Sequence, residues 1–162
     1  MVELWAACEA DPQFTRRPTW QGAPAETGAL ARLRHDPLLA ELTRRSPSRV
    51  FARFVARLRE FALLLAGRAS PTVGAQAVPS GGIAWVENAR GLLVHHVRLQ
   101  ADRASMYRIV APTEWNFHPD GALASALIRA PAHDLDAVRR RVVRTAHSLD
   151  PCVACRVEFE DA

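Results

Sequence analysis

The sequence contains no lysine, a single tyrosine and only three cysteines among its 162 residues. A small, odd number of cysteines excludes the disulfide framework of a small secreted protein and indicates a reducing compartment. The start of the chain has neither a basic segment nor a long apolar run, which excludes a signal peptide. The longest apolar stretch, residues 61–67, is far shorter than the ~20 residues that cross a bilayer. These absences predict a cytoplasmic protein without a membrane span.

All 21 basic residues are arginine, and the chain has a net charge of +4. An arginine bias of this kind is typical of a GC-rich genome, and the charge excess is too small to indicate nucleic-acid binding. Hydrophobic residues make up 49% of the chain, which excludes disorder as its main state. The length is sufficient for one domain with a real core and hardly for two.

The first 29 residues differ from the rest of the chain in their turn-forming composition. Three prolines and two glycines fall in this segment, and its apolar residues show little periodicity. We therefore expect an extended arm over residues 1–29, with one short helical turn near Leu4. Residues 30–162 are expected to form the single domain on which this arm lies.

The rest of the chain combines helical and strand patterns. The clearest helix, residues 48–66, has apolar residues on one side, and we expect this side to be buried. The other side carries Arg49, Arg53, Arg57 and Glu60 and is expected to face solvent. Shorter helices are predicted around residues 30–33, 37–42, 122–129 and 134–147, strands at 83–87, 92–99 and 106–111, and irregular segments at 70–82 and 112–121. The expected fold class is α+β, mostly helical with a small antiparallel sheet.

Two cysteines spaced by two residues, Cys152 and Cys155, can direct both sulfurs to one point. A redox pair would need a helix after the first cysteine, and here the predicted helix precedes the pair. A structural zinc site would need two further ligands, for which only Cys8 and scattered histidines are available. Half of a site for a soft metal fits the spacing better, and a pair of buried structural cysteines is the remaining alternative.

The cysteine pair belongs to one of five recognisable motifs that are spread along the chain. Residues 147–155 read His-Ser-Leu-Asp-Pro-Cys-Val-Ala-Cys, and residues 26–32 read Glu-Thr-Gly-Ala-Leu-Ala-Arg. Between them lie Ser-Arg-Val-Phe-Ala-Arg at 48–53, Glu-Asn-Ala-Arg-Gly-Leu at 87–92 and Pro-Thr-Glu-Trp-Asn at 112–116. Taken in the order of the sequence, the five motifs resemble the C-terminal part of the large subunit of nickel-iron hydrogenases. The resemblance implies the fold of that part of the subunit.

The resemblance also implies roles for individual residues. Cys155 matches the cysteine that bridges iron and nickel, and Cys152 matches a terminal nickel ligand. Both assignments agree with the preference of soft metals for thiolates.

Around the metal, Arg90 matches an arginine beside the cyanide ligands of the iron, which its fixed donors can complement. Pro112 and Thr113 match a turn that packs against, and hydrogen-bonds to, the diatomic ligands. His147 and Glu26 match residues behind the ligands, where His147 would orient the cysteine loop through hydrogen bonds.

Two departures from the family pattern bear on function. The family takes two of its four cysteine ligands from an N-terminal cysteine pair, and this chain has only the lone Cys8 in its place. Glu158 stands where the family has a histidine that is a magnesium ligand. These departures resemble the HupK-type hydrogenase expression/formation proteins, which implies a non-catalytic maturation scaffold with no catalytic residue.

Such a scaffold would transiently hold iron with cyanide and carbonyl ligands, with nickel the less favoured metal, and its partners would be maturation chaperones and hydrogenase subunits. A fragment of a catalytic large subunit, which binds nickel and oxidises hydrogen, is the alternative. A zinc or redox module is the third interpretation.

Overall fold

A computed structural model of the chain describes all residues except 1, 47, 79, 129–133, 155 and 159–162. The helices are α1 (Val2–Ala10), α2 (Ala29–Arg32), α3 (Pro37–Arg45), α4 (Val50–Leu65), α5 (Pro112–Asn116), α6 (Ala122–Leu127) and α7 (Leu135–Ser148). The strands are β1 (Thr19–Trp20), β2 (Ala23–Pro24), β3 (Val73–Val78), β4 (Gly81–Asn88), β5 (Gly91–Gln100) and β6 (Arg103–Val110). This confirms the α+β fold class. None of the helices in the described part of the chain is both long and apolar enough to cross a membrane.

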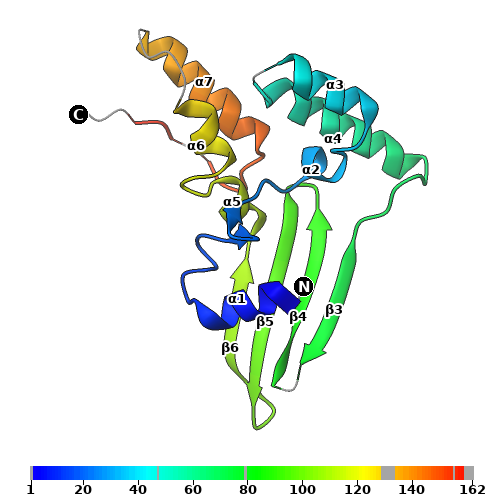
Figure 1. Ribbon diagram of the computed structural model, residues 1–162, viewed down its shortest axis with the longest axis vertical. Helices are drawn as coiled ribbons and strands as arrows, with labels where there is room; N and C mark the ends of the chain where they lie inside the picture. Colours follow the sequence, from blue (N-terminus) through cyan, green and yellow to red (C-terminus); the bar gives the residue numbers. More distant parts are fainter. Residues whose placement is uncertain (1, 47, 79, 129–133, 155, 159–162) are drawn as a thin grey trace.

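The four long strands form an antiparallel meander in the order β3-β4-β5-β6. One face of this sheet packs against α1, which lies across it in Figure 1. The other helices lie towards one end of the strands. Alternation along β5 places Val94 and His96 on the covered face. The core between sheet and α1 consists of Leu4, Cys8, Phe14, Ile83, Val94, Val110 and Trp115.

The expectation of a loop over residues 70–82 is wrong, because β3 pairs along its whole length with β4. Small residues in this segment gave it the composition of a loop. One of them, Gly74, lies opposite Trp85 in the register, and a side chain at position 74 would collide with the indole ring. The glycine is thus required by packing across the strands rather than by a turn.

The first part of the 1–29 segment is helical over more residues than the single turn expected near Leu4. Val2–Ala10 is a nine-residue helix, and Leu4 and Cys8, one turn apart, are buried against the sheet. The prolines of the segment all follow residue 10, so they cannot interrupt this helix. Only the part after α1 is non-helical, and it includes the short β1–β2 pair.

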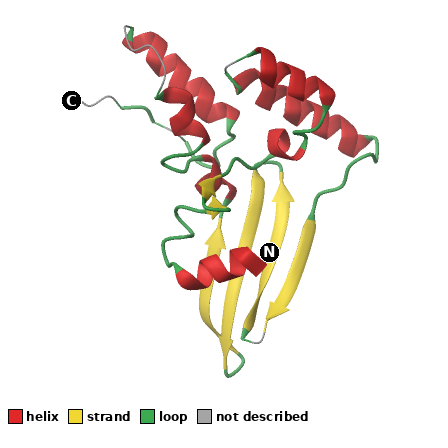
Figure 2. Cartoon of the chain, in the orientation of Figure 1, coloured by secondary structure: helices red, strands yellow, loops and turns green. Residues whose placement is uncertain are grey.

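The helices other than α1 gather at one end of the sheet, where α4 packs against α2, α3 and α7 (Figure 2). Two helix starts are as predicted. Asp36 caps α3 by accepting from the backbone N–H of Leu38 at 3.0 Å, with Pro37 in the first turn. Asp134 caps α7 in the same way through Asp136, at 2.9 Å.

The orientation of α4 is the reverse of the one expected. Arg53 is buried together with the small residues Ala52 and Ala56, whereas Leu58 and Leu65 are 70% and 74% exposed. Alanines allow the neighbouring helices to approach closely, and the buried guanidinium of Arg53 is paired with the carboxylate of Glu26, as described below. The prediction that the apolar side of this helix is buried is therefore wrong.

Candidate functional site

The segments that carry the sequence motifs meet at the junction of the sheet with the helices. A pocket there is lined by the 26–30 segment, by the turn between β4 and β5, by Asn116 of α5 and by the end of α7. Residues more than 120 positions apart in the sequence thus face one small space. The pocket therefore brings the segments that carry the motifs together at one place.

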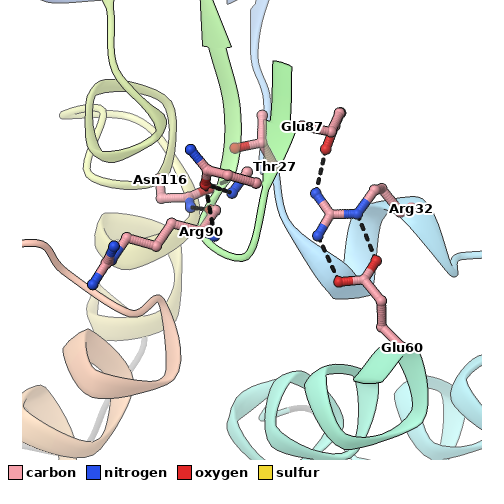
Figure 3. A network of polar contacts seen from close by, with 8 residues as sticks. Thr27, Arg32, Glu60, Glu87, Arg90 and Asn116 are labelled. Carbon is pink, nitrogen blue, oxygen red and sulfur yellow. Dashed lines mark hydrogen bonds and ion pairs between the residues drawn. The ribbon is translucent and has the colours of Figure 1, made fainter. Parts of the chain in front are cut away.

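The backbone of Arg90 is fixed in the turn between β4 and β5. Asn88 Oδ1 accepts hydrogen bonds from the backbone N–H groups of Arg90, at 2.9 Å, and of Gly91, at 3.2 Å. Asn116 Nδ2 donates to the carbonyl of Arg90 at 3.2 Å, and its Oδ1 accepts from the N–H of Thr27 at 2.9 Å (Figure 3). The buried amide of Asn116 therefore clamps two loops together.

Two glycines permit this close approach of the loops. Gly91 has a φ of +135°, and a Cβ at this position would collide with the hydroxyl oxygen of Thr27. A Cβ on Gly28 would lie 3.2 Å from the carbonyl oxygen of Arg90. Side chains at either position would push the turn away from the 26–28 segment.

The side chain of Arg90, in contrast to its backbone, is 46% exposed and points to the loop after α7. Its Nε lies 3.8 Å from Oδ2 of Asp150, and Arg57 Nη1 lies 3.5 Å from the other oxygen of the same carboxylate. Asp150 has a φ of +56°, and its N–H donates to the carbonyl of His147 at 3.1 Å. Only Pro151 separates Asp150 from Cys152, so the arginine pair lies beside the start of the cysteine loop.

A buried ion pair lies behind this loop. Arg53 Nε and Nη2 donate to the two carboxylate oxygens of Glu26 at 2.8 and 2.9 Å, and Nη1 donates to the hydroxyl of Ser148 at 3.0 Å. Arg49 approaches the same carboxylate to 3.9 Å. The pair links the 26–28 segment, α4 and the last turn of α7, and so positions the two loops that face Arg90.

A second network holds the other side of the turn. Arg32 Nε and Nη2 donate to Glu60 at 2.6 and 2.7 Å, and Nη1 donates to Glu87 at the end of β4 (Figure 3). Burial lowers the pKa of Arg32, but these hydrogen bonds outweigh it and raise the pKa above its usual value. The guanidinium remains charged and joins α2, α4 and β4.

The charges around the pocket do not cancel. Arg53, Arg57 and Arg90 line it together with two carboxylates, those of Glu26 and Asp150. The excess of positive charge, supplied by donors with fixed geometry, favours an anionic or strongly hydrogen-bond-accepting group at this place.

The predicted site residues differ in their burial and in their distance from the pocket. Cys152 is exposed, and Cys155 lies outside the described residues. The imidazole of His147 is exposed, and the backbone carbonyl of His147 accepts a hydrogen bond from the N–H of Asp150 at the start of the cysteine loop. Pro112 is buried and Thr113 is half-buried in the first turn of α5, one turn before Asn116, and neither is among the described residues that line the pocket.

Within the described residues, no three His, Cys, Asp or Glu side chains lie close enough together to hold a metal ion. The third cysteine, Cys8, belongs to the core under α1, where burial raises the pKa of its thiol. The residues that position the site, among them Arg53, Asn116 and Arg57, were missed as functional residues in the sequence. Asn116 could have been found, because an amide among apolar neighbours signals a buried polar contact.

Comparison with known proteins agrees with the motifs. The sequence profile of the nickel-dependent hydrogenase family matches residues 68–158. The hydrogenase expression/formation protein HoxV of Cupriavidus necator is 40% identical, over 99% of this chain and 44% of that protein. HupK of Rhizobium leguminosarum, also described as a hydrogenase expression/formation protein, is 34% identical over 99% of this chain and 45% of its own length.

Among solved structures, the Ni-Fe-Se hydrogenase of D. vulgaris Hildenborough superposes with a TM-score of 0.59 at 26% identity, covering 84% of this chain and 36% of that one. The chain thus spans less than half the length of the curated relatives it matches. The profile match covers more than half of the chain, and the fold agrees with it. The resemblance found in the sequence is confirmed: this chain belongs to the nickel-dependent hydrogenase family.

Proposed function

We propose that this chain acts in the maturation of nickel-iron hydrogenases, as a non-catalytic scaffold that transiently holds an iron fragment with cyanide and carbonyl ligands. Relatives that match 99% of the chain carry the name of hydrogenase expression/formation proteins. In this proposal the iron fragment is cargo, and the chain supplies the groups that receive and release it.

The observation that carries the proposal is the position of Arg90 beside Asp150. Sixty residues apart in the sequence, the two side chains come within 3.8 Å, so a half-exposed guanidinium lies next to the loop that leads into Cys152 and Cys155. Thiolates are suitable ligands for iron, and a guanidinium can donate hydrogen bonds to anionic cyanide. Cysteine pair and arginine together match the two kinds of group that such a fragment presents.

The remaining site residues have supporting roles in this proposal. Pro112 and Thr113 would contact the diatomic ligands from the start of α5, whose Asn116 holds the carbonyl of Arg90. Glu26 would act through Arg53, and His147 through its carbonyl, by positioning the loop. Nickel is the less favoured cargo, because two thiolates and the guanidinium of Arg90 suit an iron fragment better than a bimetallic centre that takes four cysteine ligands.

Exposure of Cys152 suits a carrier that exchanges its cargo with other proteins. We expect the partners to be maturation chaperones that load the fragment and hydrogenase subunits that receive it, all of them in the cytoplasm. A thiolate at the surface can be reached by an incoming ligand without unfolding of the scaffold.

Infrared spectroscopy tests the proposal directly. The chain, purified after co-expression with the hydrogenase maturation machinery, should show cyanide and carbonyl stretching bands together with bound iron. Cys155→Ala should abolish the bands, and Arg90→Met should shift the cyanide bands. Arg140→Met, which removes an exposed arginine of α7, is the matched control and should leave them unchanged.

Spectra without such bands in both the unaltered chain and Cys155→Ala would refute the scaffold. Bands of equal intensity in the two proteins would refute the assignment of the cysteine as ligand.

A second candidate is a fragment of a catalytic large subunit. It is supported by the superposition on a hydrogenase with a TM-score of 0.59. Hydrogen uptake by the chain mixed with a hydrogenase small subunit would favour this candidate, and its absence alongside the infrared bands would favour the scaffold.

A further inference from the structure

The outward side of α4 is a stripe of large apolar residues that the described part of the chain leaves exposed. It consists of Phe51, Phe54, Leu58, Phe61 and Leu65, which are exposed by 63%, 47%, 70%, 59% and 74%. Their spacing alternates between three and four residues, which aligns them along one side of the helix. We call these five residues the α4 stripe.

The stripe is too large to be an ordinary surface feature. At ~200 Å² for a large side chain, the exposed fractions amount to on the order of 600 Å² of apolar surface, whereas monomeric proteins rarely expose more than a few hundred Å² in one patch. Phe61 also lines a groove together with Leu64, Pro71 and the turn before Arg90. The apolar surface therefore extends from α4 to the edge of the candidate site.

The helix uses its other side for the contacts within the chain. Ala52, Arg53 and Ala56 are buried against the neighbouring helices, so α4 cannot rotate to hide the stripe without exposing the Arg53 ion pair. An apolar side that stays exposed in a well-packed helix calls for a second polypeptide surface.

The relatives indicate what that surface is. More than half of HoxV and of HupK lies outside the region that this chain matches, although the chain itself is matched along 99% of its length. In those proteins the equivalent of α4 has this additional polypeptide available to cover it. Alternating spacings of three and four residues fit a helix as the covering element.

A second copy of this chain is the other occupant to consider. The three arginines of α4 all have carboxylate partners within the chain, Arg53 with Glu26, Arg57 with Asp150 and Arg59 with Asp36, and Glu60 is bound to Arg32. These charges are engaged within the chain and do not select a second copy, whereas the unmatched part of HoxV and HupK is a polypeptide that always accompanies the equivalent of α4.

We propose that the α4 stripe is the docking surface for a helix of the polypeptide that supplies the part of the large-subunit fold outside the matched region. The surface is connected to the candidate site through Arg57. Its guanidinium lies 4.6 Å from the centre of the Phe54 ring and 3.5 Å from Asp150. The docking surface does not depend on the iron cargo, so each can fail without the other.

The test uses the full chain and, as probe, the segment of Cupriavidus necator HoxV outside the matched region. The two are co-expressed as separate polypeptides, and analytical ultracentrifugation should find a one-to-one complex. Leu58→Glu should weaken it at least about tenfold. Leu135→Glu is the matched control, since Leu135 is 64% exposed on a different helix, and should leave the affinity unchanged. Circular dichroism should show the same fold in both variants.

A second measurement serves the case in which the HoxV segment does not fold on its own. The same segment is joined to the chain by a flexible linker, and maleimide labelling of Leu58→Cys is compared with that of Leu135→Cys. Attachment of the segment should slow labelling only at position 58. Unchanged labelling at position 58 would overturn the proposal, as would a homodimer of the chain that Leu58→Glu dissociates, because a second copy would then be the occupant.

Discussion

Replacement of Arg53 by methionine tests the most deeply buried charge of the site. The side chain of Arg53 is 6% exposed and that of Glu26 is 13% exposed, and they share two hydrogen bonds of 2.8 and 2.9 Å. Arg53→Met leaves the carboxylate of Glu26 buried without its main partner. Removal of one member of a buried ion pair costs ~3–5 kcal/mol, because the remaining charge stays desolvated.

The structure places the expected loss at the lower end of this range. Arg49 approaches Glu26 to 3.9 Å but is 57% exposed, so it compensates only part of the lost interaction. A loss of ~3 kcal/mol in the free energy of unfolding corresponds to a fall of roughly 6–12 °C in the melting temperature of a chain of this length.

Urea denaturation followed by circular dichroism measures the change. The double variant Glu26→Leu, Arg53→Met removes both charges and should recover most of the loss, since an apolar replacement of a buried pair is often neutral. Arg45→Met removes an arginine that is 72% exposed in an ion pair with Glu41, and should cost less than ~1 kcal/mol. A loss below ~1 kcal/mol for Arg53→Met, or a double variant no more stable than the single one, would refute this reasoning.

Two further predictions concern the clamp and the covered face of the sheet. Asn116→Ala should lower the free energy of unfolding by ~2 kcal/mol and speed hydrogen exchange at the amide of Thr27, because the N–H of Thr27 and the carbonyl of Arg90 lose their partner. Unchanged exchange at Thr27 would contradict the clamp. Burial, aided by Arg108, lowers the pKa of His96, so the unfolded chain binds the proton more readily than the folded one. The free energy of unfolding should therefore fall as the pH drops below about 6.5. Urea titrations from pH 8 to 5 should show a shallower fall for His96→Gln than for the unaltered chain, and equal slopes would contradict the assignment.

Local signals in the sequence were sufficient for most of the fold. Pro37 and Asp134 predict helix starts because such signals depend on neighbouring residues alone. The strands 83–87, 92–99 and 106–111 follow from their β-type residues. The β3 segment was missed because its small residues resemble a loop, although one of them, Gly74, is required by contact with Trp85 across the sheet. Such a requirement is invisible until the pairing is known.

The orientation of α4 shows what an apolar pattern cannot predict. Periodicity identified the helix correctly, but the pattern does not specify whether its apolar side meets this chain or another one. The buried Arg53 depends on Glu26, 27 positions away, and Asn116 on Thr27 and Arg90, 89 and 26 positions away. Long-range polar pairs of this kind have no local signature, so the motifs predicted the segments of the site and not the residues that hold them together.

The site separates a fixed framework from exposed reactive groups, and this division follows from burial. The backbone around Arg90 is held by Asn88, Asn116 and Gly91, which are engaged in hydrogen bonds or close packing. The guanidinium of Arg90 and the thiol of Cys152 are exposed, so their rearrangement costs little. A group bound between them can therefore enter and leave while the framework stays folded, as the proposed carrier role requires.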